Sequence, residues 1–103
     1  MLKHCVFMAL RPDHDPAMLS DAMALIGSLV DAVPGMCDFS AGPNLDFEGK
    51  SLDYGYGFVI TFADRAAHLA YDLHPDHKAA GSAIVSLCAG GHMGIFVADL
   101  NIP

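Results

Sequence analysis

The segment Tyr71-Asp72-Leu73-His74-Pro75-Asp76-His77 decides the fold, because it lies between two helical patterns that a proline separates. Asp64 is placed to cap a short helix that runs through Leu73, and Pro75 cannot extend that helix without a break. Pro75 is instead well placed to begin another helix, which we expect to run to about Ala89. The sequence therefore predicts a second helical region that is split at this proline.

The remaining regular elements can be placed by working outward from this break. We expect a strand over 2–10, a helix over 16–33, strands over 36–41 and 54–62, and a last strand over 92–100. The first helix is expected to begin at Asp15-Pro16 and to end before Pro34-Gly35. The order β-α-β-β-α-β is the ferredoxin-like motif. We therefore expect an α+β fold with a four-stranded antiparallel sheet and helices over one face.

The length and the apolar composition predict one domain that pairs with itself. The chain has 103 residues, which fits a single domain over 1–103. Hydrophobic residues make up 53% and charged residues 17%, so some apolar surface is expected to be hidden by a partner or to line a pocket. The sheet face away from the helices carries Cys5, Phe7, Val59 and Thr61 as its candidates. A second copy covering that face would give a homodimer through the sheet faces.

Charge and cysteine content narrow the classes of partner. The formal net charge is −7, and the five basic residues are spread along the chain, which disfavours nucleic acid and anionic membrane surfaces as partners. The three cysteines form no CxxC pair and are expected to be reduced and buried. No stretch has the length of a membrane span, and the first apolar run resembles a strand rather than a signal peptide. We therefore expect a cytoplasmic protein.

Tyr71 and His77 are the strongest candidates for chemistry. His77 falls in the first turn of the helix expected to begin at Pro75, where the partial positive charge of the helix terminus favours the neutral ring. Helical steps from His77 reach the apolar or small residues Ala80, Gly81, Ile84 and Cys88. A neutral imidazole can accept a proton and a tyrosine hydroxyl can donate to a carbonyl or an enolate, so the pair suits proton abstraction next to a carbonyl. The alternative is that both residues only tie the helix break together.

The other histidines have structural and functional interpretations. His4 lies between apolar neighbours, where a satisfied core histidine is the commoner explanation and a pocket role is the alternative. His68 lies three residues before Tyr71 and can share its helix face. A metal site of His4, His74 and His77 is a further hypothesis, disfavoured because a proline separates the last two and no acidic residue is clearly placed beside them. Phosphate-loop and GxSxG patterns do not occur.

The chain resembles the stress-responsive A/B barrel (Dabb) family over nearly its whole length. The matching pieces are Lys3-His4, Val33-Pro34-Gly35-Met36, Gly42-Pro43-Asn44, Tyr54-Gly55-Tyr56-Gly57-Phe58, Tyr71 with His74-Pro75-Asp76-His77, and Gly94-Ile95-Phe96-Val97-Ala98-Asp99-Leu100. The resemblance implies a homodimer in which two sheets pack into an α+β barrel. One branch of the family contains plant stress proteins without established chemistry. Another contains olivetolic acid cyclase-type proteins, which close a ring by aldol condensation without a cofactor.

The resemblance to the cyclases also suggests roles for individual residues. The cyclase base and tyrosine correspond to His77 and Tyr71, and its first-strand pocket histidine corresponds to His4. Tyr56 stands where the cyclase has a further pocket histidine. We therefore expect a small apolar carbonyl ligand, with His77 as base, Tyr71 as hydrogen-bond donor and His4, Tyr56 and His74 as binding residues, without metal or cofactor. Cyclase-, isomerase- or lyase-like catalysis and a non-enzymatic, stress-associated or ligand-binding homodimer remain open alternatives.

Overall fold

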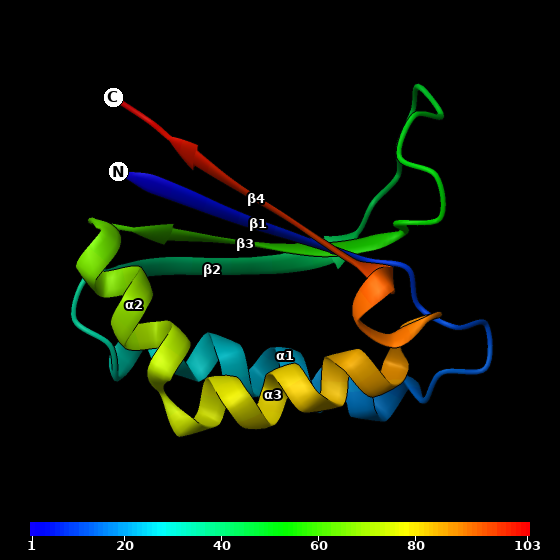
Figure 1. Ribbon diagram of the computed structural model, residues 1–103, viewed down its shortest axis with the longest axis horizontal. Helices are drawn as coiled ribbons and strands as arrows, with labels where there is room; N and C mark the ends of the chain where they lie inside the picture. The colour runs from blue at the N-terminus through cyan, green and yellow to red at the C-terminus, as the bar shows by residue number, and fades with distance from the viewer.

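The computed structural model describes residues 1–103 and contains four strands, three α-helices and two short 3₁₀ turns (Figure 1). In chain order the elements are β1 (Leu2–Met8), α1 (Pro16–Ser28), η1 (Leu29–Asp31), β2 (Met36–Pro43), β3 (Tyr56–Phe62), α2 (Arg65–Leu73), α3 (Pro75–Leu87), η2 (Gly91–Gly94) and β4 (Ile95–Asn101). The predicted ferredoxin-like order, with its second helix divided in two, is confirmed.

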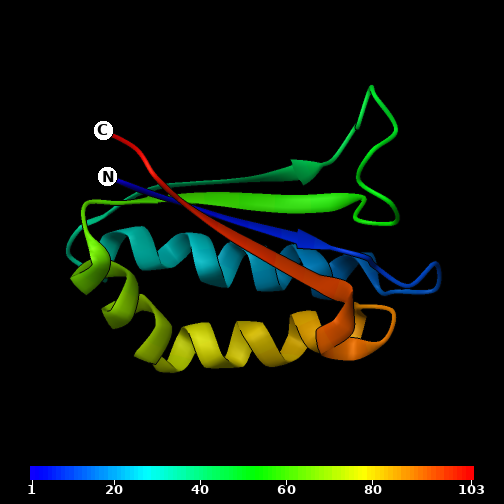
Figure 2. The same cartoon turned by 45° about the horizontal axis from the view of Figure 1, so that its top comes forward.

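The strands form one antiparallel sheet in the order β2-β3-β1-β4. β1 is central, so that Val6 pairs with Phe58 on one side and with Val97 on the other. All three helices lie on the same side of the sheet, with α1 and α3 side by side and α2 at one end (Figures 1 and 2). The chain ends lie together at the β1–β4 edge, where the Met1 amino group donates to the carbonyl oxygen of Ile102 at 2.9 Å.

The helices begin where capping side chains and prolines predict. Asp15 accepts a hydrogen bond from the Ala17 amide at 2.9 Å, and Asp64 accepts one from the Ala67 amide at 2.9 Å. His74 ends α2 and also caps α3, because its Nδ1 accepts from the Asp76 amide at 3.1 Å. The chain therefore turns at a single residue between two helices. None of the helices is long and apolar enough to cross a bilayer.

The core fills the space between the sheet and the helices, and it follows the alternation of the strands. His4, Val6 and Met8 of β1 are buried toward the helices, whereas the intervening residues of β1 are half-buried on the opposite face. The largest side chains with almost no exposed surface are Tyr71, Phe62, Met8, Ile26, Leu29, Ile60 and Leu87. Tyr71 is thus both a core residue and a lining residue of the cavity described below.

Element boundaries differ from the sequence-based expectation in all four strands and in two of the helices. β2 ends two residues later, β3 begins two residues later and α3 ends about two residues earlier than expected. The α-helix ends at Ser28 rather than near Val33, and the buried Leu29 and Val33 continue the apolar spacing through η1 and the turn after it. β1 ends at Met8, and Leu10 forms only an isolated bridge with Cys88. β4 begins at Ile95 because residues 91–94 form η2.

The outer face of the sheet is open, and it is more apolar than polar. It carries Cys5, Phe7 and Val59 as expected, and it also presents Phe96, which is 51% exposed, and Leu100, which is 53% exposed. Thr61 lies on this face too, opposite Lys3, but it is only 4% exposed, and its hydroxyl accepts from the Lys3 amine at 2.6 Å. A Cβ added at Gly57 would lie 2.8 Å from the Phe7 ring, so the glycine lets that ring lie flat on the sheet.

The connection between β2 and β3, residues 44–55, projects from the sheet as an arm on the side away from the helices (Figures 1 and 2). Asp46 organises the arm, since its carboxylate accepts from the amides of Lys50 at 3.0 Å and Ser51 at 2.7 Å. A hydrogen bond from the Ser51 hydroxyl, together with those from the two amides, lowers the pKa of Asp46 to about 2. The arm exposes Phe47 and Leu52 almost completely, at 92% and 89%.

The three cysteines are unpaired, and their burial differs from the expectation. Cys88 is buried as predicted, but Cys5 is half-buried on the outer sheet face and Cys37 is exposed at the start of β2. Burial raises the pKa of the Cys5 and Cys88 thiols. The thiolate that a nucleophile requires is therefore disfavoured at both positions.

Candidate functional site

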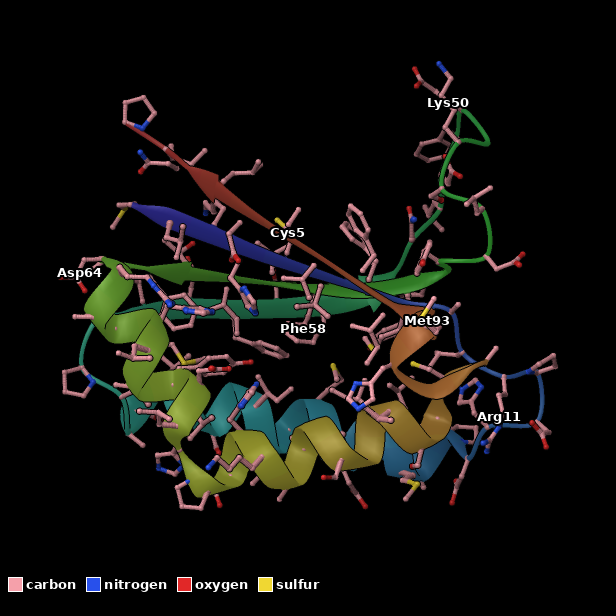
Figure 3. The ribbon with its side chains drawn as sticks, viewed as in Figure 1. Cys5, Arg11, Lys50, Phe58, Asp64 and Met93 are labelled. Carbon is pink, nitrogen blue, oxygen red and sulfur yellow. The ribbon has the colours of Figure 1, made fainter.

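A cavity of about 730 Å³ lies between the sheet and the helices α2 and α3. Phe58 points into this space from β3 (Figure 3). Its polar lining includes four histidines and one tyrosine: His4, His68, His77, His92 and Tyr71. Its apolar lining is formed by Val6, Ile26, Phe58, Ile84, Val85, Ile95 and Val97. The cavity therefore combines an apolar wall with a concentration of groups that can exchange protons.

The helix break brings Tyr71 of α2 and His77 of α3 together. Their ring centroids are 4.4 Å apart, and the rings are inclined by 53°. Five residues separate them in sequence, and the turn at His74 and Pro75 allows both side chains to line the same cavity. The structure thus brings together the two residues expected to act as base and donor.

The hydrogen bonding of His77 leaves one ring nitrogen free. Its Nδ1 lies 3.1 Å from the carbonyl oxygen of Asp72, and because a carbonyl can only accept, Nδ1 carries the hydrogen. Burial lowers the pKa of His77, and the nearby Asp72 carboxylate opposes this shift only in part. The ring is therefore neutral at neutral pH, with the lone pair on Nε2. That nitrogen is the basic atom of the cavity.

Tyr71 presents a hydroxyl that no protein group engages. The residue is 1% exposed, and its ring packs against Phe62 with centroids 5.1 Å apart. No hydrogen bond within the chain involves its oxygen, yet no fully buried side-chain oxygen or nitrogen lacks a partner, so the hydroxyl reaches the cavity. Burial raises the pKa of Tyr71, with a smaller contribution from the Asp72 charge. The group therefore stays protonated and able to donate.

His4 is held by a carboxylate from the neighbouring strand. His4 and Asp99 pair directly across β1 and β4, and the His4 Nδ1 donates to Asp99 Oδ1 at 2.6 Å. His4 is 7% exposed and its ring centroid is 5.9 Å from that of Tyr71. His4 is therefore a satisfied buried histidine, and its side chain also lies in the lining of the cavity.

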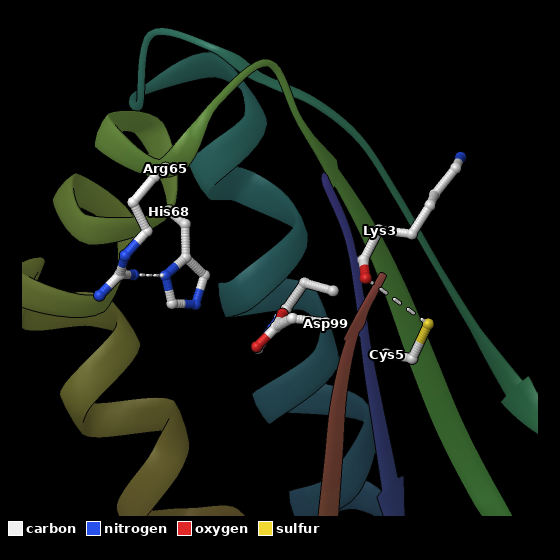
Figure 4. Close-up of polar contacts among 6 residues, drawn as sticks. Lys3, Cys5, Arg65, His68 and Asp99 are labelled. Atoms are coloured by element: carbon white, nitrogen blue, oxygen red, sulfur yellow. Dashed lines mark hydrogen bonds and ion pairs between the residues drawn. The ribbon is translucent and has the colours of Figure 1, made fainter. Parts of the chain in front are cut away.

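His68 joins this group from α2. Its ring centroid lies 4.9 Å from that of His4 and 5.3 Å from that of Phe62. An Arg65 guanidinium nitrogen contacts its Nδ1 on the side away from the strands, and Asp99 faces the group from β4 (Figure 4). Burial lowers the pKa of His68, assisted by His4 and Arg65 and opposed by the carboxylates of Asp99 and Asp72.

One cluster has the composition of a metal site, but it is not the expected one. The atoms of His4, His68 and Asp99 that could ligate an ion all lie within 4.8 Å of one another. Two of these side chains already share a hydrogen bond, and Arg65 occupies one nitrogen of the third. His74 does not join the cluster, because its Nδ1 caps α3. His4 Nδ1, Asp99 Oδ1 and His68 Nδ1 are thus paired within the protein.

Two residues expected to bind a ligand lie outside the cavity lining. Tyr56 is at the beginning of β3, paired with Met8 and Pro43, and His74 is at the turn between α2 and α3. His68 and Asp99, in contrast, contribute to the site without having been chosen from the sequence. The spacing of His68 and Tyr71 on one helix face signalled the former, whereas nothing local marks Asp99, which meets His4 only through strand pairing.

The fold and the whole length of the chain match one protein family. The model of the family described as the Stress responsive A/B Barrel Domain, Dabb, matches residues 2–102. The chain belongs to the Dabb family. This confirms the family suggested by the sequence. No curated protein matches the chain.

Solved structures of similar proteins agree with the ferredoxin-like fold of this Dabb chain. A dimeric ferredoxin-like protein of unknown function from Jannaschia sp. CCS1 is 42% identical, with 98% of each chain covered and a TM-score of 0.93. A Dabb family protein from Mesorhizobium loti is 22% identical, with 99% of this chain and 96% of that chain covered and a TM-score of 0.72. The hydroxynitrile lyase of Passiflora edulis is 19% identical, with 99% and 93% covered and a TM-score of 0.81. At these identities the last two show the fold alone.

Proposed function

We propose that this Dabb protein is a homodimer that binds a small apolar carbonyl compound in the cavity and transfers protons without a cofactor. His77 is the base and Tyr71 is the hydrogen-bond donor. The observation that carries the proposal is the pairing of an unengaged imidazole nitrogen with an unengaged hydroxyl, on rings 4.4 Å apart in one cavity. Because one group accepts and the other donates, the pair is complementary to a carbonyl next to an acidic C–H bond.

The reaction needs only the movement of one proton and one electron pair. His77 Nε2 takes the proton from the carbon beside the carbonyl, and the electrons of that C–H bond become the enolate. The Tyr71 hydroxyl donates to the enolate oxygen, where the negative charge develops. The imidazolium then returns the proton to the enolate, or to another atom of the ligand, which restores the neutral ring. The apolar walls of the cavity strengthen these interactions, because they lower the local dielectric below that of bulk water.

The remaining lining supports an apolar ligand body. Val6, Ile26, Phe58, Ile84 and Val97 supply the walls, and His4 lies beside Tyr71 as a further polar contact. The Passiflora edulis relative is a hydroxynitrile lyase, so lyase chemistry is compatible with this fold. Isomerisation and aldol cyclisation both require a base beside the carbonyl and a donor at its oxygen, whereas hydroxynitrile cleavage requires a base that takes the hydroxyl proton and an acid that protonates the leaving cyanide. A base and a proton donor at one oxygen-bearing carbon are common to all three reactions. We therefore place the proposal at this shared chemistry.

The homodimer is supported by one relative and one surface. The Jannaschia protein, at 42% identity, is dimeric. The outer sheet face of this chain presents Phe7, Val59, Phe96 and Leu100 toward solvent, and such an apolar face is stabilised when a second copy covers it. Light scattering at micromolar protein concentration tests the assembly. A monomeric mass would contradict the dimer.

A non-enzymatic ligand-binding homodimer is the second candidate. The observation that favours it is the burial of Tyr71, which is 1% exposed and lies among the largest core side chains. In that case Tyr71 and His77 would stabilise the helix break and shape the cavity. The two candidates differ in whether a bound carbonyl compound exchanges its protons.

Proton exchange into heavy water tests the proposal without knowledge of the natural substrate. The protein is incubated in D₂O with cyclohexanone or acetophenone, and loss of the proton signal beside the carbonyl is followed by NMR. We expect exchange above the buffer rate, and we expect His77→Gln to lower it by roughly 10²–10⁴-fold, the usual contribution of a general base.

His14→Gln is the matched control. His14 also donates from Nδ1 to a backbone carbonyl, that of Arg11 at 2.7 Å, but it lies outside the cavity lining. Equal exchange in His77→Gln and His14→Gln, or exchange at the buffer rate in the unmodified protein, would refute the catalytic proposal and favour the binding protein.

A further inference from the structure

His68 has a hydrogen-bonding state that its neighbours define. Arginine is always protonated in proteins and has no acceptor, so the Arg65 guanidinium must donate to the His68 Nδ1 that it contacts. A ring nitrogen that accepts carries no hydrogen. The single hydrogen of the neutral His68 ring is therefore on Nε2.

This assignment sets His68 apart from His4 and His77, the two cavity histidines whose rings lie nearest to Tyr71. His4 and His77 each donate from Nδ1, to Asp99 and to the Asp72 carbonyl, and the neutral His77 ring keeps its lone pair on Nε2. His68 is the reverse, because its acceptor nitrogen is occupied and its N–H is the unengaged atom. His68 thus offers a hydrogen-bond donor where His77 offers an acceptor.

We infer that His68 is a second donor to the oxygen of the bound ligand, beside Tyr71, and that Arg65 is the positioning residue that holds His68 in this state. The two donors, His68 and Tyr71, come from α2 and are three positions apart in sequence. Both side chains line the cavity, and their ring centroids are 6.2 Å apart. Two neutral donors on one side of a cavity select a ligand whose oxygen carries negative charge, such as an enolate, an alkoxide or a phenolate. The inference rests on the proposed function, and it names the oxyanion as the recognised group.

The pairing within the cluster favours this interpretation over a cation site. A cation bound between His4, His68 and Asp99 would need a lone pair of His68, so it would have to displace either the Arg65 guanidinium from Nδ1 or the hydrogen from Nε2. An oxyanion requires neither change, because it accepts from the hydrogen that His68 already presents.

Binding of 4-nitrophenol tests the inference without turnover, because the phenolate is an oxyanion whose colour reports its ionisation. We expect the protein to bind 4-nitrophenolate, and His68→Phe, which keeps a ring of similar shape, to weaken it by roughly tenfold to a hundredfold, the contribution of a hydrogen bond to a charged group. Arg65→Met is expected to weaken binding in the same direction, and Arg65→Lys, which retains a donor, to restore part of it. Arg11→Met is the matched control, since Arg11 is an exposed arginine that contacts Asp13.

NMR of the histidine rings separates positioning from a merely structural role. With ¹⁵N-labelled protein, and with His68→Phe to assign the signal, we expect the neutral His68 ring to carry its hydrogen on Nε2. In Arg65→Met the titration midpoint of His68 is expected to rise, because a competing donor and positive charge have been removed. A hydrogen on Nδ1, or an unchanged midpoint, would overturn the role of Arg65.

The two proposals fail in different ways. Absence of 4-nitrophenolate binding to the unmodified protein, or equal binding in His68→Phe, would overturn the donor role of His68, even if exchange depended on His77. Binding that depends on His68, without ketone exchange in the unmodified protein, would support the oxyanion site and remove the proposed proton transfer.

Discussion

Replacing Tyr71 by phenylalanine separates its chemistry from its packing. The hydroxyl makes no hydrogen bond within the chain, while the ring is 1% exposed and packs against Phe62. Tyr71→Phe therefore keeps the buried ring and removes only a group that faces the cavity. We expect the free energy of unfolding to stay within about 0.5 kcal/mol of the unmodified protein, as for changes that break no internal contact.

The effect on exchange should be much larger than the effect on stability. Loss of one donor to an oxyanion costs about 10²–10³-fold in rate. We therefore expect Tyr71→Phe to exchange the protons of cyclohexanone about 10²–10³-fold more slowly than the unmodified protein. The companion Tyr71→Ala removes the ring as well and should cost about 3–5 kcal/mol, the usual penalty for a large aromatic in a core. With a urea dependence of about 1–3 kcal/mol per molar, that loss lowers the unfolding midpoint by more than about 1 M.

Urea unfolding followed by circular dichroism, at one fixed protein concentration because a dimer is expected, measures both variants. If Tyr71→Phe lost more than about 1.5 kcal/mol, the range in which a lost internal hydrogen bond would lie, its hydroxyl would be part of the structure. The hydroxyl would then be unavailable to a ligand, and the reasoning about the site would be refuted.

Three further predictions concern pH, the arm and metal ions. Burial lowers the pKa of His77 in the folded state, so its contribution to stability is present above the unfolded pKa of about 6.5 and is lost as the pH falls toward the lower folded value. The melting temperatures at pH 7.5 and pH 5 should therefore differ less in His77→Gln than in the unmodified protein. An unchanged difference between these two melting temperatures would contradict the burial effect. Asp46→Ala removes the acceptor for the amides of Lys50 and Ser51, so hydrogen exchange of these two amides should accelerate while that of β1 is unchanged; protection equal to that of the unmodified protein would show that the carboxylate does not organise the arm. After incubation with Zn²⁺ and dialysis, the protein should retain no stoichiometric metal, because Arg65 occupies a nitrogen of His68; one zinc per chain that is lost in His68→Phe would show instead that the cluster is a metal site.

The order of elements was predictable because its signals are local. Two such signals are the proline at position 75 within a helical pattern and the alternation of buried and half-buried residues along β1. Each can be recognised from residues that are neighbours in the chain. Boundaries were less predictable where apolar spacing outlasts the α-helix, as at Val33, which is buried beyond the end of α1. Tertiary packing, rather than helix geometry, buries that residue.

The site was predictable only in the part that the helix break creates. Tyr71 and His77 flank one proline, so their proximity follows from local structure. Asp99 is 95 residues from His4, and the two meet because strand register places them opposite each other. The state of His68 depends on which atom Arg65 contacts, and only side-chain positions could show this.

The pairing of β1 with β4 determines when, during folding, the cavity is completed. The first and last strands of the chain form adjacent positions of the sheet, and His4 meets Asp99 across that boundary. Contacts between distant segments form late, because closing a long loop costs entropy before it returns stability. A nascent chain on the ribosome can thus form its helices while the cavity still lacks the wall that β4 supplies. Until that last strand emerges, the edge of β1 is unpaired and available to another chain. Pairing with β4 therefore forms the contact between His4 and Asp99 and covers this open strand edge in the same step.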